Sequence, residues 1–317
     1  MSLAFLGDAV FATDEAMFVT GMAADPIGGS VFLSYAMKTH THESTRWRSG
    51  VREVSLLADT STSTSTSVVP ATAPTPAPVR DAYSARELNA FVYGVGFVIA
   101  TRTLLVCASD MQDGEIVRCL EGLARRSVAN GWDWNVEHRL QCEKTWGCLG
   151  PVRFAELADA HVLFGERYWG ARVLQLLRVS PAHRIESVAS IDVPDGFHTF
   201  DGRVIAGDAL VAFVAKDKSH VRLSRLLPSN ALQQLSRIDL PRTQKLLWSG
   251  DRLLAGYWNK EHKAYSIVEA QRAGDTIASA RVLLDEKNSF EWCFVDHVDR
   301  TAIFDIHTKE LFVHSAR

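Results

Sequence analysis

The sequence lacks any apolar run long enough to cross a membrane as a helix. Its longest hydrophobic stretches have the length of single strands, and several contain glycine or arginine, whereas a membrane-spanning helix needs about 20 apolar residues. The N-terminus has no basic region, and Asp8 interrupts its first apolar run, so we expect no signal peptide. We therefore expect no membrane insertion.

Neither sign of charge is in large excess. The chain of 317 residues carries a formal net charge of −3. Lys and Arg are scattered, and no basic run is interleaved with aromatic residues, as binding to nucleic acid or to an anionic membrane surface would favour. We therefore expect no nucleic-acid partner.

Cysteine is scarce and irregularly spaced. The five cysteines are an odd number, which does not fit a disulfide framework, so we expect free buried thiols. No Asn-x-Ser/Thr glycosylation acceptor occurs in the sequence. Together these absences favour a reducing, cytoplasmic location.

Motifs for metals and cofactors are also missing. His40 and His42 have the spacing of metal ligands on a strand, but they lie in a polar stretch that we expect to be a solvated loop. The glycines at 94 and 96 sit inside an apolar run, without the remainder of a phosphate-binding fingerprint. We expect no metal site and no cofactor.

The second half of the sequence contains a weak internal repeat. Ile191-Asp192-Val193-Pro194 returns 47 residues later as Ile238-Asp239-Leu240-Pro241, and a looser copy begins at Val282, a further 44 residues on. A period in the mid-forties built from short apolar runs is typical of a β-propeller, in which four-stranded blades repeat around an axis. We therefore predict an all-β chain that forms a single β-propeller domain over residues 1–317.

The strand-sized runs divide into six modules. The fifth is the clearest, because Gly, Asp and Asn turns separate its runs at 245–248, 252–258, 264–270 and 277–284. The sixth begins at Phe290 and is one strand short, so we expect residues 3–6 to supply its outer strand. Six four-stranded blades closed by an N-terminal strand are the favoured count, and five or seven blades stay open.

Two segments depart from the strand pattern. Residues 60–78 read TSTSTSTSVVPATAPTPAP, with almost nothing large to bury, so we expect a disordered loop between two blades. The alternative is a tether, or a segment regulated by modification of its hydroxyl groups. In the insert at 121–130, Leu120, Leu123 and Ala124 fall on one face of a helix, which predicts the only helix of the chain.

The segment from Ser127 to Trp134 resembles a known turn motif. It reads Ser-Val-Ala-Asn-Gly-Trp-Asp-Trp and is similar to the Asp-box, Ser-x-Asp-x-Gly-x-Thr-Trp, of sialidase-like propellers. Ser127, Gly131 and Trp134 match the motif, whereas Ala129 and Asp133 replace its Asp and Thr. In that family the box forms the hairpin between the third and fourth strands of a blade, and its role is structural. The resemblance therefore supports a propeller fold.

The resemblance also implies a chemistry. Sialidase-like enzymes hold a substrate carboxylate with three arginines and use an acid/base Asp and a Tyr–Glu nucleophile pair. The early strand with an Arg-Ile-Pro core that the family carries is missing here. Residues of the required types at similar strand positions are Arg102, Arg153, Arg203, Arg252, Glu166 and Tyr168. We treat Arg102, Arg153, Glu166, Tyr168 and Arg203 as candidate binding residues and assign no catalytic residue.

Two functions are compatible with these patterns. The first is a non-catalytic scaffold that binds a protein or peptide partner on its loops or in its channel, because the repeat comes with no convergent catalytic set. The second is a sialidase-like or other sugar-processing hydrolase that uses residues around the channel. The meeting of Arg102, Arg153 and Arg203 with Glu166 or Tyr168 at one mouth of the channel would favour the enzyme, and their scatter would favour the scaffold.

Overall fold

The fold is built from β-strands alone in the part of the chain that the structure describes. This computed structural model describes residues 2–5, 11, 17–40, 45–56, 79–85, 90–112, 115–128, 131–143, 146, 150–167, 170–240, 242–261, 263–273, 276–286, 290–295 and 300–315. Over these residues its regular elements are the strands β1 to β23. No helix in this part of the chain is long and apolar enough to cross a membrane.

Three of the sheets are separate antiparallel blades whose four strands follow one another in sequence. Blade 1 contains β2 (Met17–Asp25), β3 (Ser30–His40), β4 (Thr45–Ser55) and β5 (Val79–Ser84). Blade 2 contains β6 (Val92–Val98), β7 (Thr103–Gln112), β8 (Glu115–Val128) and β9 (Gly131–Gln141). Blade 5 contains β17 (Thr243–Ser249), β18 (Arg252–Asn259), β19 (Ala264–Ala273) and β20 (Thr276–Glu286), as the spacing of its turns predicts.

One long strand joins blades 3 and 4. The first half of β13 (Ile185–Ile205) pairs with β12 (Ala171–Val179), and its second half pairs with β14 (Asp208–Ala215). Blade 3 also contains β10 (Val152–Glu156) and β11 (His161–Glu166), and blade 4 contains β15 (Val221–Leu226) and β16 (Leu232–Ile238). Between the two halves Gly196 has φ 67°, a conformation that glycine adopts without steric cost. The described strands thus form five hydrogen-bonded sheets. The seven-stranded sheet contains blades 3 and 4, which share β13, so the strands make up six four-stranded units.

The N-terminal strand completes blade 6. β21 (Phe290–Phe294), β22 (Arg300–Asp305) and β23 (Leu311–Ser315) pair in order, and β1 (Ser2–Phe5) pairs antiparallel with β23 from Ser2–Ser315 to Phe5–Phe312. The predicted closing strand is confirmed, one residue earlier than expected.

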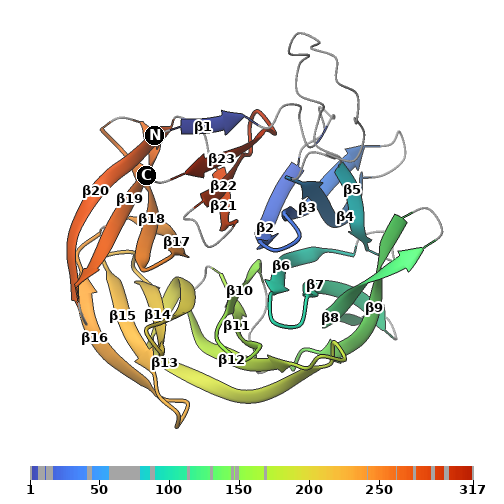
Figure 1. Ribbon diagram of the computed structural model, residues 1–317, viewed down its shortest axis with the longest axis horizontal. Helices are drawn as coiled ribbons and strands as arrows, with labels where there is room; N and C mark the ends of the chain where they lie inside the picture. The colour runs from blue at the N-terminus through green and yellow to red at the C-terminus, as the bar shows by residue number, and fades with distance from the viewer. Residues whose placement is uncertain are drawn as a thin grey trace, which may run out of the picture.

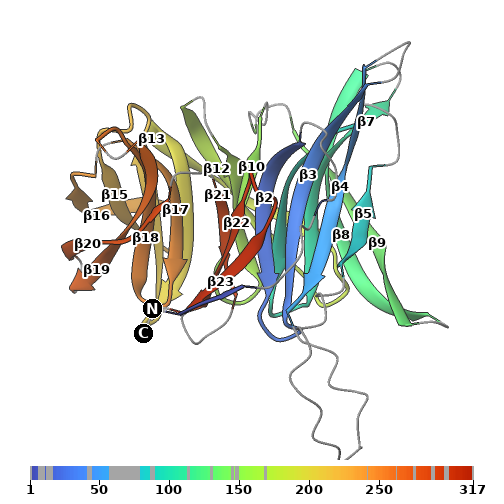
Figure 2. The ribbon, with the colours of Figure 1, turned by 90° about the horizontal axis from the view of Figure 1, so that it is seen from above.

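The blades surround a central channel. Their innermost strands neighbour one another in a closed ring that runs through β2, β6, β10, β13, β17 and β21 (Figure 1). Seen from the side, these inner strands begin at the upper rim of the ring and end at the lower rim, where Ser2 and Ser315 also lie (Figure 2). We use these two names for the rims below.

A separate hydrophobic cluster fills each of the six boundaries between adjacent blades. Because side chains alternate along a strand, one strand serves two boundaries. Leu246 packs towards blade 4, and Leu247, its neighbour, packs towards blade 6. At the boundary between blades 6 and 1, the Phe11 ring lies against Tyr35 and Phe304, with centroid distances of 5.1 and 5.9 Å.

The structure corrects two expectations. The helix predicted at 121–130 is wrong, because β8 continues as a strand to Val128. Leu120 packs towards blade 3 and Leu123 towards blade 1, so the apolar spacing reflects burial on both faces of a strand. Residues 60–78 lie outside the described residues, but β4 and β5 on either side of them pair within blade 1, so the prediction of a connection between two blades is wrong.

Trp134, from the Asp-box-like segment, contributes to a buried polar junction between blades 1 and 2. Ser127 lies in β8 and Trp134 in β9, the third and fourth strands of blade 2. The Trp134 indole N–H donates a hydrogen bond of 3.0 Å to Glu53, which is fully buried in β4. Glu53 also accepts from Ser30 (2.7 Å), Arg80 (3.1 Å) and Arg125 (2.5 Å). One carboxylate therefore satisfies four donors at this boundary.

We predict that Glu53→Gln weakens this junction strongly. The amide has no negative charge to match the two arginines and turns a donor towards other donors, so the free energy of unfolding should fall by about 3 kcal/mol. Glu137→Gln is the matched control, since Glu137 forms a bidentate pair with the exposed Arg126 and a hydrated pair contributes little. Urea unfolding of both variants measures the difference, and equal losses would contradict the assignment.

We also predict that deletion of residues 1–5 opens the ring. The edge of β23 would lose its partner strand, which should lower the free energy of unfolding by about 2–4 kcal/mol and promote self-association through the bare edge. Deletion of residues 316–317 is the control truncation. Urea unfolding and sedimentation velocity report the two effects, and a deletion of residues 1–5 that behaves like the control would show that β1 is not needed for closure.

Candidate functional site

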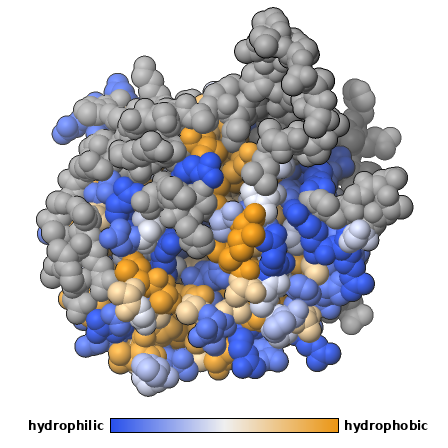
Figure 3. Space-filling model, viewed as in Figure 1, coloured by the Kyte–Doolittle hydropathy of each residue, from blue (hydrophilic) through white to orange (hydrophobic). Residues whose placement is uncertain are grey.

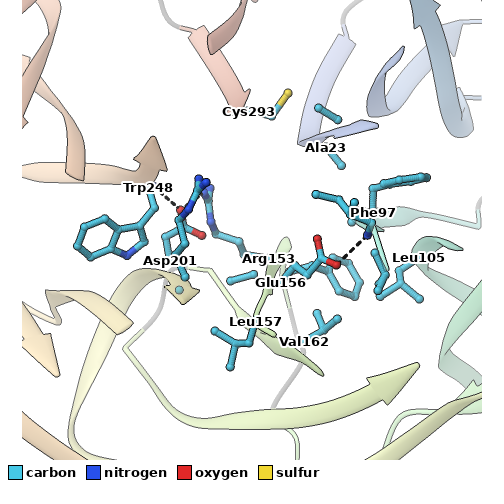
Figure 4. Close-up of a pocket in the computed structure, with 18 of the residues that line it drawn as sticks. Ala23, Phe97, Leu105, Arg153, Glu156, Leu157, Val162, Asp201, Trp248 and Cys293 are labelled. Atoms are coloured by element: carbon cyan, nitrogen blue, oxygen red, sulfur yellow. Dashed lines mark hydrogen bonds and ion pairs between the residues drawn. The ribbon is translucent and has the colours of Figure 1, made fainter. Parts of the chain in front are cut away.

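One described cavity occupies the central channel. It has a volume of about 450 Å³ and is lined by parts of all six inner strands. Arg153 and Asp201 lie on one side of it, and Glu156 and Phe97 lie on the opposite side (Figure 4). In the space-filling view, apolar and hydrophilic side chains are interleaved around the centre of the ring (Figure 3). The cavity is thus mixed in character, with few charged groups on an apolar wall.

An ion pair between blades 3 and 4 forms one side of the cavity. Arg153, in β10, places its Nη2 at 3.3 Å from Oδ2 of Asp201 in β13. The same carboxylate oxygen accepts a hydrogen bond of 2.7 Å from the backbone N–H of Trp248 in blade 5. Asp201 therefore links three consecutive blades while it neutralises Arg153.

A second charged cluster lies nearer the upper rim. Glu291, in β21, accepts from Arg167 at 3.2 and 3.4 Å and forms an ion pair of 2.6 Å with Lys245 in β17. Lys245 also donates to the backbone carbonyl of Phe290. All three side chains are buried. The cluster brings together residues of blades 3, 5 and 6.

The electrostatics of this cluster keep the Glu291 carboxylate charged. Burial alone would raise the pKa of Glu291, but the positive charges of Arg167 and Lys245 outweigh it and lower that pKa to about 2. Burial lowers the pKa of the Lys245 ammonium, and Glu291 opposes this effect. A carboxylate held ionised between two cations is suited to a structural ion pair and not to proton transfer near neutral pH.

Glu156 behaves differently. Its Oε1 accepts hydrogen bonds from the backbone N–H groups of Ile99 (2.7 Å) and Ala100 (3.4 Å) in blade 2. Burial raises the pKa of Glu156 to about 7, although these N–H groups and the positive charge of Arg203 act in the opposite direction. Glu156 is therefore a cavity carboxyl group that titrates near neutral pH.

The residues predicted from the sequence do not all meet. Arg153 and Arg203 both line the cavity, whereas Arg102 and Glu166 do not belong to its lining. Arg102 lies in the β6–β7 turn, half-exposed, and forms an ion pair of 2.5 Å with the buried Asp25 of blade 1. Glu166 is buried at the end of β11. Tyr168 lies outside the described residues.

Sequence reasoning missed most of the charged residues in the channel. Asp201, Lys245 and Glu291 lie in inner strands, and Glu291 is the one charge in the run Phe-Glu-Trp-Cys-Phe. A lone charge in a run buried on both faces was the available signal, because such a group must find a partner. Arg167 was not predicted as a site residue, although its neighbours Glu166 and Tyr168 were. Its partner Glu291 is 124 residues away in sequence.

Thiol and metal chemistry have little support in the part of the chain that the structure describes. The four described cysteines, Cys107, Cys119, Cys142 and Cys293, are buried and are not joined in disulfides, as expected. Burial strongly raises the pKa of the Cys293 thiol beside the cavity, which disfavours the nucleophilic thiolate. Among the described residues, no three or more His, Cys, Asp or Glu side chains are grouped to hold a metal ion.

Comparison with known proteins supports the propeller fold. No protein-family model matches the sequence, and no curated protein sequence matches it significantly.

Among solved structures, the chain is similar to a neuraminidase-like protein from A/bat/Guatemala/164/2009, with 10% identity, a TM-score of 0.50, and coverage of 96% of this chain and 90% of that one. A subtype N10 neuraminidase-like protein of A/little yellow-shouldered bat/Guatemala/060/2010 gives 8% identity, a TM-score of 0.50, and coverage of 98% of both chains. The Dos1 propeller gives 9% identity, a TM-score of 0.48, and coverage of 95% of this chain and 75% of that one. At these identities the likeness shows the fold alone: the chain is a β-propeller.

We predict that Glu156 makes stability depend on pH. Its pKa of about 7 in the folded protein exceeds the ordinary value of 4.5, so the folded state binds the proton more tightly and stability falls as pH rises from 4.5 to 7. Glu156→Gln stays neutral and keeps an acceptor for Ile99. At pH 8 it should therefore be more stable than the wild type by up to about 3 kcal/mol, and at pH 5 the difference should be small.

Urea unfolding at pH 5 and pH 8 measures this difference. Glu186→Gln is the control, because the Glu186 side chain is 53% exposed in a surface pair with Arg178. Parallel pH profiles for the wild type and Glu156→Gln would contradict the raised pKa.

Proposed function

We propose that the protein is a non-catalytic β-propeller scaffold that binds a protein or peptide partner. The observation that carries this proposal is the use of charge in the channel. Asp201 of blade 4 engages Arg153 of blade 3, and Glu291 of blade 6 engages both Lys245 of the adjacent blade 5 and Arg167 of blade 3. These groups already have partners within the chain, so their chemistry is used to hold the ring together.

The pairing of the arginines argues against an arginine site for a substrate carboxylate. Such a site needs guanidinium groups that face the ligand and are not already bound by carboxylates. Arg102, Arg153 and Arg167 each have a carboxylate partner in the chain. Separating a buried pair to receive a substrate would cost several kcal/mol, roughly 3–5. The four described cysteines, which are buried and not joined in disulfides, support the proposal of a reducing, cytoplasmic setting.

A second candidate function is a sugar-processing hydrolase that uses the cavity. The observation that favours it is Glu156, a cavity carboxyl with a pKa of about 7 near the positive charge of Arg203. A carboxyl group with a pKa in this range is suited to act as a general acid. The neuraminidase-like neighbours share the fold at 10% identity or less and do not decide between the two functions.

The decisive test compares turnover and binding in the same preparations. The wild type and Glu156→Gln would be incubated between pH 4.5 and 8 with fluorogenic sialosides and other glycosides. A random 12-residue peptide library would be selected against the wild type, and enriched peptides measured on both proteins. The scaffold proposal expects no saturable turnover in either protein, and peptide dissociation constants that differ less than twofold between them.

Saturable hydrolysis by the wild type that is lost in Glu156→Gln would overturn the scaffold and establish the hydrolase. A slow, non-saturable hydrolysis rate that is equal in both proteins would agree with the scaffold, whereas saturable hydrolysis that is equal in both would overturn the scaffold without involving Glu156. Failure to enrich any peptide would contradict the peptide-binding part of the proposal.

A further inference from the structure

Four aromatic side chains form a continuous row at the upper rim of blades 1 and 2. Phe18, at the start of β2, lies 5.8 Å from Trp47 of β4, as measured between ring centroids. Trp47 lies 4.9 Å from Phe91, and Phe91 lies 6.1 Å from Tyr93 of β6. The row therefore crosses the boundary between the two blades. We call these four residues the aromatic row.

The aromatic row is accessible to solvent. Phe18 is 56% exposed, and the other three rings are partly exposed. Most large hydrophobic side chains of the described chain are instead buried in the boundary clusters. Contiguous apolar side chains on a rim, where burial against the neighbouring blade is incomplete, are typical of a surface that a partner covers.

Two cations lie beside the aromatic row. Lys38 pairs directly with Trp47, the second ring of the row, in the register of β3 and β4, so the two side chains lie on the same face of blade 1. At the Tyr93 end of the row, the guanidinium carbon of Arg118 lies 3.8 Å from the centroid of the Tyr93 ring. Arg118 is partly exposed, and a carboxylate is the best match for a guanidinium group.

We propose that the aromatic row is the docking surface for an extended acidic peptide segment of a protein partner. Apolar side chains of the segment would cover Phe18 and Trp47, and an Asp, Glu or C-terminal carboxylate would bind Arg118. This inference rests on the proposed scaffold function and adds the place and the chemistry of the contact. The two cations favour an acidic segment over a basic one.

The geometry of the rings favours a peptide over a single-stranded nucleic acid. Stacked bases need a series of open ring faces. Here Arg118 covers one face of Tyr93, and Trp47 is tilted by 41° and 48° against its two neighbours. The row therefore presents ring edges and one exposed ring, which suit aliphatic and aromatic side chains.

The experiment uses the full chain, a displayed random 12-residue peptide library and four proteins. Selection on the wild type should enrich acidic residues combined with Leu, Phe or Trp. Synthetic peptides would then be measured by fluorescence anisotropy on the wild type, Phe18→Ser, Arg118→Gln and Ile27→Ser. Ile27 is the matched control, since it is 63% exposed and lies in the β2–β3 turn at the lower rim.

We expect Phe18→Ser and Arg118→Gln each to weaken binding on the order of tenfold, and Ile27→Ser to leave it unchanged. Reversing the peptide's charge with Lys should abolish binding, and 0.5 M salt should weaken it. Thermal unfolding of each variant would establish that the ring is intact. Because Phe18 is largely exposed, Phe18→Ser keeps the test valid even if Arg118→Gln unfolds.

Three results would overturn the inference. Selected peptides that bind Phe18→Ser and the wild type equally would place the docking surface elsewhere and leave the scaffold function standing. Preferential enrichment of basic peptides would contradict the assigned chemistry. Binding of a 12-residue oligothymidine that is lost in Phe18→Ser would assign the row to nucleic acid. Enrichment of no peptide at all would instead remove the scaffold function on which the inference rests.

Discussion

The ring must close without backbone hydrogen bonds between most of its blades. Within a blade, the strands pair through their backbones, but adjacent blades meet face to face and are held by side chains. Every strand near the channel is therefore buried on both faces, and one apolar cluster fills each boundary. Any polar group buried at such a boundary has to find a partner within the protein, because water is excluded, and several find one on another blade. This constraint explains where the buried charges lie.

The buried carboxylates satisfy this constraint in a common way. Glu53, Asp201 and Glu291 each accept hydrogen bonds or ion pairs from more than one blade. A buried ion pair adds little net stability, because desolvation offsets most of the attraction, but loss of one partner is costly. These groups therefore fix how each blade is positioned against the next more than they increase the stability of the ring. Glu156 is the exception, because it meets backbone donors and its burial raises its pKa towards neutrality.

The architecture could be predicted from the sequence because local patterns encode it. The apolar pairs Leu246–Leu247 and Leu253–Leu254 already show strands buried on both faces, and the Gly and Asp turns between them fix the hairpins. The same two-sided burial produced the error at Leu120 and Leu123, since a spacing of three fits a helix face as well as a fully buried strand. The site could not be predicted, because the carboxylate partners of Arg153 and Arg167 come from other blades, and no local pattern records that contact. Arg102 was selected as a candidate binding residue, but it forms an ion pair with Asp25 of blade 1 and lies outside the cavity lining.

The division between channel and rim follows from the same constraint. In a closed ring, the ion-paired side chains near the axis are surrounded by other blades, and their ion pairs hold those blades together. Side chains at the ends of the strands are covered on one side only, so the upper rim can expose Phe18. Recognition at the rim needs no change in the buried ion pairs, and sequence can vary there without opening the ring. This division between buried ion pairs and exposed aromatic rings is what the proposed scaffold function requires, and the fold alone does not specify a substrate.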